Sequence, residues 1–490
     1  MIDHPLIQMP LHKPEDLGKP IPNSMHAISM CLPTWDNIIG YEENIPTTMN
    51  EIKLGYPRFL IHPYIHYLIE RINPDPSRKA LPFANIEPAN RLKKYIQTKH
   101  SKENIDILAT HNIYLVIFSV DCCDIAERGW QLFGEGISSR HAKALLDSKT
   151  ISEDQNTKDH IRRKIADYTL TNYNHIFIFS SGMASINAVM RALKEINPEK
   201  DFAQFGFPYG DTLKLMEYHN KYETRFYPNG DEQDYKHIEA DIKKESFAGI
   251  FSEFPSNPLL NCCDLDKLGK ISNLYNCPLI LDETLGACIN THTHQHVDIS
   301  IISLTKYFSG QGDVMGGAVL INPNRPFSKI LLEKLKNAEK ENFCFKEDLV
   351  QLQQYSENLP QRMEIINKNT LEIVAFLKDH PAIEEVWYPN LTSKNIYDHY
   401  ARKEKSYGGV LSFVLEYPEE NTIPFYDKLD ICKGPNLGTV FSLCCPFVML
   451  AHYNELDWAE EAGVSRWLIR LSVGLEPATE IISRLDKALT

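Results

Sequence analysis

Apolar runs of strand length alternate with helical patterns from Tyr173 onward. After Ser181, apolar residues recur at three- and four-residue spacing, as expected for an amphipathic helix. The runs predicted as strands are His175–Ser180, Phe247–Phe254, Pro278–Asp282, Ile299–Thr305 and Gly316–Ile321. Short buried strands that alternate with helices predict a largely parallel sheet with helices on both faces, which is an α/β domain.

The flanking regions show other patterns. Residues 1–60 are rich in proline and lack periodicity, which predicts an irregular arm. A helix is expected over His62–Ile72, a strand over Asn112–Val120 and a polar loop over Asp147–Lys158. Phe327 to Asp379 is mostly helical in pattern, and shorter strands such as Gly409–Leu415 and a closing helix over Pro477–Leu489 follow. We therefore expect four parts: an N-terminal arm and inserted region (1–170), a large domain (171–330), connecting helices (331–380) and a small α+β C-terminal domain (381–490).

Charge and cysteine usage exclude several classes of protein. The 490 residues carry 51 Lys and Arg against 65 Asp and Glu, for a net charge of −14. Broad nucleic-acid surfaces need clustered positive charge, so this balance disfavours them. No apolar stretch in the sequence reaches the roughly 18 residues of a membrane span, and the first residues lack a signal-peptide pattern. The eleven cysteines have no CxxC spacing, which favours reduced thiols in the cytoplasm.

Two motifs follow predicted strands and could serve an anionic, heterocyclic ligand. In SSGMAS (180–185), Gly182 permits close approach, and helix N–H groups with serine hydroxyls suit a phosphate. An ordinary capped helix explains the same residues as well. Asp282 ends a strand at the edge where α/β sheets bind ligands, and a protonated pyridine nitrogen would be a suitable partner. A capping or loop aspartate is the alternative.

A third motif is the lysine in Ser303-Leu304-Thr305-Lys306. An uncompensated ammonium directly after a buried strand is costly, and a Schiff base to an aldehyde cofactor removes that cost. In an extended segment Ser303 and Thr305 share a side, so both hydroxyls could bind a phosphate. Taken alone, the motif also describes a surface lysine. Its place downstream of the other two motifs favours the catalytic interpretation.

These pieces resemble the Cys/Met-metabolism family of pyridoxal-phosphate (PLP) enzymes. That family includes cystathionine γ-synthase, cystathionine β-lyase, methionine γ-lyase and the acylhomoserine sulfhydrylases. The matching segments occur in the family's order: SSGMAS (180–185), PYGDT (208–212), EFPSNPLL (253–260), LDET (281–284), SLTKYFSGQGDVMGG (303–317), GGVLSFVLE (408–416), FSLCCPFVMLAHY (441–453) and RLSVGLE (470–476). The resemblance implies the fold type I of PLP-dependent transferases, with a mostly parallel large domain and a smaller α+β domain.

The resemblance also implies a role for each matching residue. Lys306 would carry the Schiff base and then move protons, assisted by Tyr209, which would stack on the pyridine ring. Asp282 would pair with the pyridine nitrogen, and the substrate α-carboxylate would meet Arg470. Asn257 would contact the ring oxygen or the substrate, and Ser442 would lie near the substrate and Lys306. The phosphate would be bound by Ser181, Gly182, Met183, Ser303 and Thr305.

The chain departs from the family's pattern at two points. It has Asp282-Glu283-Thr284 where the family usually has Asp-Asn-Thr. The family's Tyr-x-Arg pair, which reaches the phosphate from the neighbouring subunit, has two candidates. Tyr56 and Arg58 in GYPRF supply both residue types, whereas Arg140 in GISSR has Ser138 where the tyrosine would be. We favour Tyr56 and Arg58, which leaves an insertion of about 80 residues before SSGMAS. A clamp from a neighbour implies a homodimer or homotetramer.

Three further segments sharpen the expected function. HAISMCLPTWDNIIGYEENI, LGYPRFLIHP and GEGISSRHA resemble the long fungal-type cystathionine γ-synthases. The resemblance thus implies γ-replacement on an O-acylhomoserine by cysteine, giving cystathionine. The β- and γ-lyases, methionine γ-lyase and the sulfhydrylases share all these motifs and remain alternatives, as does a non-catalytic regulator that retains the fold.

One histidine cluster has the spacing of a metal site, but we do not expect it to bind a metal. THTHQH puts His292, His294 and His296 on alternate positions, where an extended strand would present all three on one face. Histidines in a polar loop are more often solvated, so no metal is expected.

Overall fold

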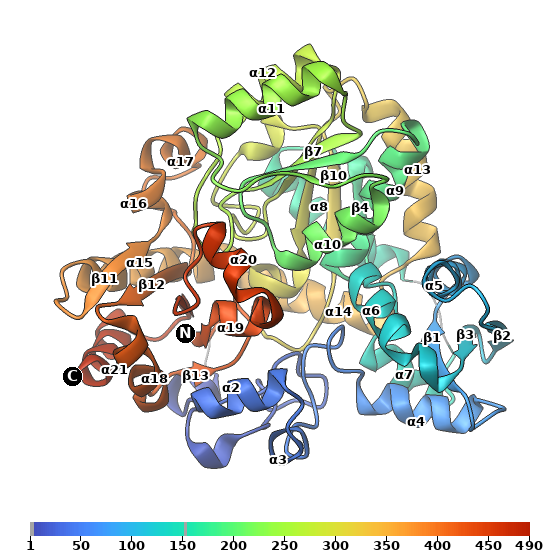
Figure 1. Ribbon diagram of the computed structural model, residues 1–490, viewed down its shortest axis with the longest axis horizontal. Coiled ribbons are helices and arrows are strands. Elements are labelled where there is room, and N and C mark those ends of the chain that lie inside the picture. Colours follow the sequence, from blue (N-terminus) through green and yellow to red (C-terminus); the bar gives the residue numbers. More distant parts are fainter. Residues whose placement is uncertain (1–3, 151–153) are drawn as a thin grey trace.

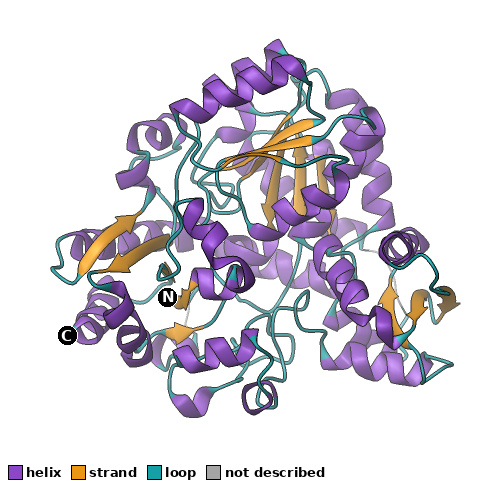
Figure 2. Ribbon diagram, in the orientation of Figure 1, coloured by secondary structure: helices purple, strands orange, loops and turns teal. Residues whose placement is uncertain are grey.

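The computed structural model describes residues 4–150 and 154–490. Its large domain is built on a seven-stranded sheet in the order β4-β10-β9-β8-β7-β5-β6 (Figure 2). The strands are β4 (Ile176–Phe179), β5 (Phe202–Phe205), β6 (Arg225–Tyr227), β7 (Gly249–Glu253), β8 (Leu279–Asp282), β9 (Ile299–Ser303) and β10 (Gly317–Ile321). Neighbours from β9 to β6 pair in parallel, whereas β10 is antiparallel to β4 and β9. The predicted α/β fold with a mostly parallel sheet is confirmed.

Helices pack on this sheet and continue into the region that joins the two domains. They are α8 (Gln155–Thr169), α9 (Gly182–Ile196), α10 (Gly210–His219), α11 (Glu232–Lys244), α12 (Leu265–Leu274), α13 (Ser328–Glu341), α14 (Lys346–Tyr355) and α15 (Leu359–Lys378). Helix α9 has the predicted apolar face, and Ile186, Val189 and Leu193 are buried on it. Because that face packs on β4, β9 and β10, the N-terminus of α9 is fixed at the edge of the sheet.

A smaller domain follows α15 and contains a five-stranded sheet in the order β11-β12-β15-β14-β13. The strands are β11 (Ile383–Trp387), β12 (Val410–Leu415), β13 (Cys432–Lys433), β14 (Leu443–Pro446) and β15 (Ile469–Ser472), and the helices are α16 (Pro389–Thr392), α17 (Lys394–Tyr400), α18 (Pro418–Lys428), α19 (Phe447–Ala451), α20 (Leu456–Glu461) and α21 (Ala478–Leu489). Strand β15 carries Arg470 and is central in the sheet. Its position is therefore fixed by pairing on both sides.

The region before the large domain folds as a unit of its own, here called the inserted unit (residues 63–146; Figure 1). It contains α4 (Pro63–Ile72), β1 (Lys79–Phe83), α5 (Ile86–Lys99), β2 (Asp106–Thr110), β3 (Ile113–Phe118), α6 (Cys123–Phe133) and α7 (Ser139–Leu146). The three strands form an antiparallel sheet in the order β1-β3-β2. Leu81, Phe83, Leu92 and Trp130 belong to its apolar core. The sequence predicts α4 and β3 but not this additional core.

The N-terminal arm lies along the small domain, beside α18 and β13 in Figure 1. It includes α1 (Pro5–Gln8), α2 (Trp35–Glu42) and α3 (Pro46–Met49), so it is less irregular than expected. The buried Lys433 donates to the Pro33 carbonyl at 2.7 Å, and Asp427 accepts the Trp35 N–H at 2.8 Å. In the described residues, no helix has the length and apolar character needed to cross a membrane.

Candidate active site

The N-terminus of α9 forms a cradle against the end of β9. Ser181 is the N-cap residue, and its hydroxyl accepts the Ala184 N–H at 3.0 Å and donates to the Gly134 carbonyl at 2.8 Å. The N–H groups of Gly182 and Met183 lie in the first turn, where no intrahelical acceptor exists. A Cβ atom at Gly182 would lie 3.1 Å from the Cβ of Ser303. These two predicted residues therefore face each other closely, with free helix N–H groups beside them.

Two carboxylates meet where β7 and β8 end. Glu253 pairs with Asp282 in the register of the two strands. Burial raises the pKa of Asp282, and burial followed by the proximity of Asp282 raises the pKa of Glu253. Asp282 accepts the Thr284 N–H at 2.8 Å, and no cationic side chain of the described residues pairs with it. A cationic partner would therefore stabilise the ionised form of these two buried acids.

Glu253 was missed by the sequence interpretation, although EFPSNPLL contains it. Its carboxylate accepts the Tyr209 N–H at 2.6 Å and the Asn257 N–H at 3.2 Å. It thus joins two loops that carry predicted site residues. Asn257 lies only four residues from Glu253, but Tyr209 precedes Glu253 by 44 residues, so the sequence alone does not reveal that Glu253 joins the two loops.

Lys306 lies just beyond β9, in a turn over Leu304–Phe308 that is kinked at Lys306 itself, where φ is −89° and ψ is −124°. Its Nζ donates to Asn436 Oδ1 at 2.6 Å and lies 4.8 Å from the centre of the Tyr56 ring. Burial lowers the pKa of Lys306 to about 7, and the positive charges of Arg470 and Arg58 act in the same direction. A neutral amine is the nucleophilic form, so this surrounding suits the formation of a covalent bond to a carbonyl.

Tyr209 and the arm residues Tyr56 and Arg58 lie on the other side of the site. Arg58 is buried, and its Nη2 donates to Tyr209 Oη at 2.7 Å while Nη1 pairs with Asp211 at 2.8 Å. Burial raises the pKa of Tyr209, although Arg58 opposes the shift. The phenol therefore stays protonated at neutral pH and can act as a proton donor. The resemblance implies that the arm pair serves a neighbouring subunit, but here both residues lie beside Lys306 and Tyr209 of their own chain.

Arg470 reaches the site from the small domain. Its guanidinium donates to Asn257 Oδ1 at 3.3 Å and to the Pro435 carbonyl at 2.8 Å, and it lies 4.9 Å from the centre of the Phe447 ring. Among the described residues, no carboxylate forms a salt bridge with it, although it is buried. A buried guanidinium bound only to neutral oxygens is suited to an incoming carboxylate.

One sequence interpretation needs correction. The strand predicted through Thr305 ends at Ser303, and the chain then enters the kinked turn over Leu304–Phe308. Thr305 therefore does not share a side with Ser303. Its hydroxyl instead accepts the Gly316 N–H at 3.1 Å and donates to the Gly316 carbonyl.

The position of Ser442 near the substrate stays a prediction. Its hydroxyl donates to Glu476 at 2.9 Å and accepts the Gly474 N–H at 2.9 Å, so its hydrogen bonds stay within the small domain. The small-domain residue that contacts Lys306 is Asn436, which the sequence interpretation missed. Asn436 Nδ2 is buried and has no hydrogen-bond partner among the described residues. The amide N–H donor beside Lys306 therefore has no acceptor from the protein.

Arg140, the rival clamp residue, is engaged elsewhere in this chain. Its guanidinium pairs with Asp313 at 3.3 Å and with Asp348 at 3.2 Å. With two carboxylates already bound, it has less charge to offer a phosphate than Arg58 has.

Glu283, which stands where the family usually has asparagine, has hydrogen-bond partners of its own. Glu283 is buried and accepts a hydrogen bond from the Ser300 hydroxyl, with 2.5 Å between the oxygens, while Ser300 Oγ also lies 3.0 Å from His294 Nδ1. Burial raises the pKa of Glu283 to about 7. The acid therefore belongs to a polar cluster behind Asp282.

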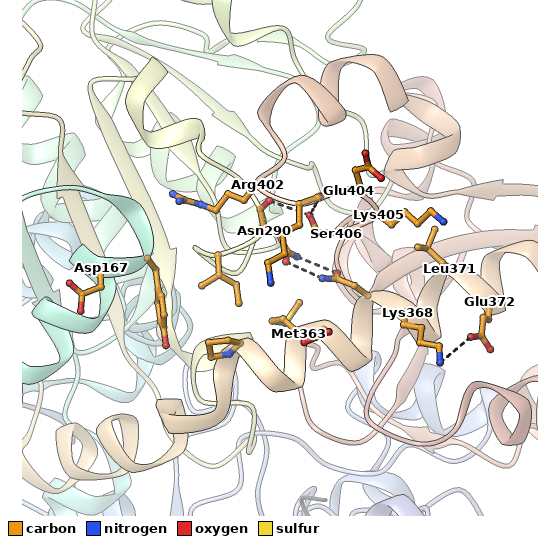
Figure 3. Close-up of a pocket in the computed structure, with 16 residues that line it drawn as sticks. Asp167, Asn290, Met363, Lys368, Leu371, Glu372, Arg402, Glu404, Lys405 and Ser406 are labelled. Atoms are coloured by element: carbon orange, nitrogen blue, oxygen red, sulfur yellow. Dashed lines mark hydrogen bonds and ion pairs between the residues drawn. The ribbon is translucent and has the colours of Figure 1, made fainter.

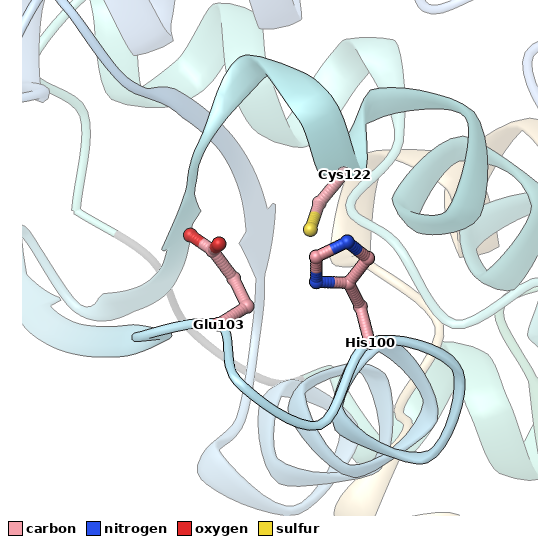
Figure 4. A group of neighbouring side chains, drawn as sticks. All are labelled: His100, Glu103 and Cys122. Carbon is pink, nitrogen blue, oxygen red and sulfur yellow. The ribbon is translucent and has the colours of Figure 1, made fainter.

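The histidines of THTHQH do not form the extended face considered above. Thr293–His296 is a short helical turn, in which His294 is buried and His296 contacts Asp266. A different set, His100, Glu103 and Cys122, brings its ligand-type atoms within 4.8 Å of one another in the inserted unit (Figure 4). His100 is exposed and Glu103 already accepts the Ser119 N–H, so this set is open to solvent on one side.

A cavity of about 620 Å³ opens between α8, α15 and residues 402–406 (Figure 3). Asn290 and Asn367 hydrogen-bond to each other in its wall at 3.1 and 3.3 Å, and its lining also includes the charged residues Lys368, Glu372, Arg402, Glu404 and Lys405. None of the predicted site residues lines it, so it is separate from the site around Lys306.

Comparison with known proteins places this site in a family. Residues 153–490 match the family model described as Cys/Met metabolism PLP-dependent enzyme. The chain belongs to this family. It is therefore a PLP-dependent enzyme, as the order of its motifs predicted. The cystathionine γ-synthase of Neurospora crassa is 30% identical over 97% of this chain and 98% of its own length.

Members of the family with solved structures share the fold. The cystathionine γ-synthase of Xanthomonas oryzae pv. oryzae, in complex with cystathionine, is 23% identical and superposes with a TM-score of 0.60 over 68% of this chain and 85% of its own. The cystathionine γ-lyase of Lactobacillus plantarum, complexed with L-serine, is 25% identical with a TM-score of 0.59 over the same shares. The fold is therefore common to synthases and lyases.

The residues present fit PLP. The phosphate suits the N-terminus of α9, the pyridine nitrogen suits the uncompensated Asp282, and the aldehyde suits the neutral amine of Lys306. Each of these three groups of the cofactor would thus bind a part of the protein that has no suitable partner within the chain.

Proposed function

We propose that the enzyme catalyses γ-replacement on an O-acylhomoserine. Cysteine thiol sulfur forms a bond to Cγ, the Cγ–O bond breaks, and the products are cystathionine and the carboxylic acid of the acyl group. The observation that carries this proposal is the likeness to the Neurospora crassa synthase, which extends over 97% of the chain and so includes the arm and the inserted unit.

Lys306 is proposed as the residue that binds the cofactor and moves protons. Bound PLP supplies an electron sink for a carbanion at the substrate Cα. The neutral Nζ can accept the α-proton and later return protons, since a base with a pKa near 7 serves both directions at neutral pH. Asn436 orients this amine through its side-chain oxygen.

Arg470 and Asn257 are proposed to bind the substrate carboxylate. Two parallel N–H donors of a guanidinium match the two carboxylate oxygens. Asn257 Oδ1 is 3.3 Å from Arg470 Nη1 and helps to orient it. Tyr209, protonated and fixed by Arg58 and Glu253, would stack on the ring and assist proton transfer.

A cytoplasmic location is part of the same proposal. All eleven cysteines are free thiols, and ten of them are buried. Reduced thiols in this number are typical of a reducing compartment.

A substrate panel tests the proposed reaction. Purified, PLP-loaded protein is given O-acetyl-, O-succinyl- or O-phosphohomoserine with cysteine, and in a separate reaction cystathionine alone, with products identified by mass. We expect cystathionine from one of the homoserine esters, with the Lys306→Ala variant as the blank. Turnover of cystathionine alone, without synthesis, would instead make the enzyme a lyase.

A further inference from the structure

Three side chains of the kinds that bind metal ions meet in the inserted unit (Figure 4). His100 caps the C-terminus of α5, Glu103 follows in the next turn, and Cys122 lies in the turn that leads into α6. An imidazole nitrogen, a carboxylate oxygen and the thiol sulfur of this set lie within 4.8 Å of one another. The reaction proposed above uses none of the three residues.

The two turns that carry these side chains are fixed by their own hydrogen bonds. The Glu103 N–H donates to the His100 carbonyl at 3.2 Å, and the Cys122 N–H donates to the Ser119 carbonyl at 3.1 Å. The Glu103 carboxylate then joins the two turns, because it accepts the Ser119 N–H at 3.2 Å. The protein itself therefore brings the three side chains together.

The burial of the set differs from one residue to the next. Cys122 is fully buried as a free thiol, Glu103 is half-buried and His100 is exposed. The Glu103 carboxylate keeps lone pairs beyond the one that accepts the Ser119 N–H. The Ser119 hydroxyl is itself buried and has no hydrogen-bond partner among the described residues, which is uncommon for a buried polar atom. An ion could thus enter from the side of His100 and reach the buried sulfur.

The combination of ligand atoms selects the kind of metal. A thiolate disfavours Mg²⁺ and Ca²⁺, which take oxygen ligands, whereas sulfur, nitrogen and oxygen together are typical of Zn²⁺. In tetrahedral zinc sites such ligand atoms lie about 3.5 Å apart, so the present set must close by about 1.3 Å at most. Rotation of the exposed His100 and the half-buried Glu103 side chains can supply this movement.

We propose that His100, Glu103 and Cys122 bind one Zn²⁺, with water as the fourth ligand on the open side. The Zn–S bond replaces the thiol S–H bond, the proton goes to solvent, and no oxidation takes place. The charges of the thiolate and the carboxylate balance those of the ion. The zinc would link the end of α5 to the start of α6 and so stabilise the inserted unit. The sequence did not predict this site, because its sulfur ligand comes from a separate turn.

Metal content tests the proposal directly. The PLP-loaded enzyme, purified without a histidine tag, is stripped with a chelator, given Zn²⁺ and freed of excess ion by gel filtration. We expect one zinc per chain by elemental mass spectrometry. Competition with a chromophoric chelator should show that Cys122→Ser and His100→Ala each weaken binding by at least about 10- to 100-fold, which is the usual effect of losing even an outer-shell partner.

Two matched controls separate this site from incidental binding. Cys123→Ser removes the adjacent cysteine, and His160→Ala removes an exposed histidine of α8, and neither residue belongs to the set. Both variants should keep one zinc per chain. Equal zinc binding by Cys122→Ser and wild type, or a wild type that binds no zinc, would overturn the proposal.

Glu103→Gln separates metal binding from folding. The amide oxygen of glutamine can still accept the Ser119 N–H, so the two turns stay joined while the negative charge is lost. Without zinc, the variant and the wild type should therefore unfold at the same temperature. Zinc should raise the unfolding temperature of the wild type more than that of the variant. Equal zinc affinity in the two proteins would mean that Glu103 is not a ligand and that the proposed set is wrong.

Cobalt identifies the sulfur ligand. Co²⁺ in a tetrahedral site with a thiolate has strong d–d absorption in the red, where PLP does not absorb. We expect these bands in the wild type and in Cys123→Ser, and their loss in Cys122→Ser. The visible absorbance of lysine-linked PLP is followed in the same samples, as a check of folding that does not depend on the proposed reaction. Weak octahedral cobalt bands in the wild type would show an ion bound without the thiolate and would overturn the proposal.

Discussion

The amine of Lys306 is surrounded by groups that favour its neutral form. Its pKa is lowered to about 7 by burial, with Arg470 and Arg58 adding to the shift. Above this pH the amine is mostly neutral and nucleophilic, and below it the amine is protonated and unreactive. The reactivity of the cofactor-free enzyme toward PLP should therefore change within the physiological pH range.

We expect the rate of PLP attachment to the cofactor-free enzyme to rise about tenfold from pH 6 to pH 8 and then to level off. The rate is measured by stopped-flow absorbance, with Nα-acetyl-lysine as the reference amine. The reference has its ordinary pKa, so its rate should keep rising about tenfold per pH unit through pH 9. An enzyme rate that keeps rising in parallel with the reference would mean that Lys306 has an ordinary pKa.

Arg470 has the surroundings of a carboxylate-binding residue, because its hydrogen-bond acceptors among the described residues are neutral oxygens. Arg470→Lys keeps the charge and loses the two-pronged geometry. We expect kcat/KM for the amino-acid substrate to fall. The fall should correspond to a loss of about 1.5–3 kcal/mol of transition-state stabilisation, and PLP affinity should not change.

Arg466→Lys is the matched control for this change, since Arg466 lies nearby in sequence and forms exposed ion pairs with Asp457 and Glu460. It should leave kcat/KM unaltered. Equal kinetics for Arg470→Lys and wild type would place Arg470 outside the substrate site.

Residues beside a recognisable strand end or motif could be predicted from the sequence, and residues that join distant segments could not. Lys306, Asp282 and Arg470 are of the first kind. Glu253 acts through the pairing of β7 with β8, and Asn436 meets Lys306 only because the small domain packs on the large one. Ser442 was chosen by its motif, but the fold directs its hydroxyl to Glu476.

At the scale of elements, the strongest feature is the contact between the N-terminus of α9 and the end of β9. Strands β4, β7, β8, β9 and β10 were predicted to within one or two residues at their ends, and α9 was predicted from its apolar periodicity, but β5 and β6 of the same sheet were not predicted. The turn over Leu304–Phe308 was not predicted, because its apolar residues continue the pattern of β9 while the backbone leaves the strand. This turn is what separates Thr305 from Ser303 and sets the direction of Lys306.

Gly182→Ala tests the cradle at the N-terminus of α9. The added Cβ would lie 3.1 Å from Ser303 Cβ and 3.2 Å from its Oγ, so the helix end or Ser303 must move apart by a few tenths of an ångström. We expect PLP affinity to fall about tenfold, measured by absorbance titration, with thermal unfolding of the cofactor-free protein nearly unchanged.

The control for this variant is Gly269→Ala in α12, where the new Cβ would meet only the His296 carbonyl at 3.7 Å. That distance is ordinary contact, so PLP affinity should not change. If Gly182→Ala also binds PLP normally, the phosphate does not lie at the N-terminus of α9.

At the scale of the whole molecule, the site is assembled from all parts of the chain. The large domain supplies Lys306 and Asp282, the small domain supplies Arg470 and Asn436, and the arm supplies Tyr56 and Arg58. The sequence did not reveal that the inserted unit contacts the arm segment of the site, because Trp130 and Gln131 hydrogen-bond to residues about 70 positions earlier in the chain.

The central claim is that Lys306 is the residue that binds PLP covalently. Reduction of the PLP-loaded enzyme with borohydride fixes the bond, and digestion followed by mass spectrometry locates it. We predict that the modified peptide contains Lys306 and that the Lys306→Ala variant yields neither a modified peptide nor the visible absorbance. Cofactor attached to any other lysine of the wild type, or visible absorbance retained by Lys306→Ala, would contradict the account.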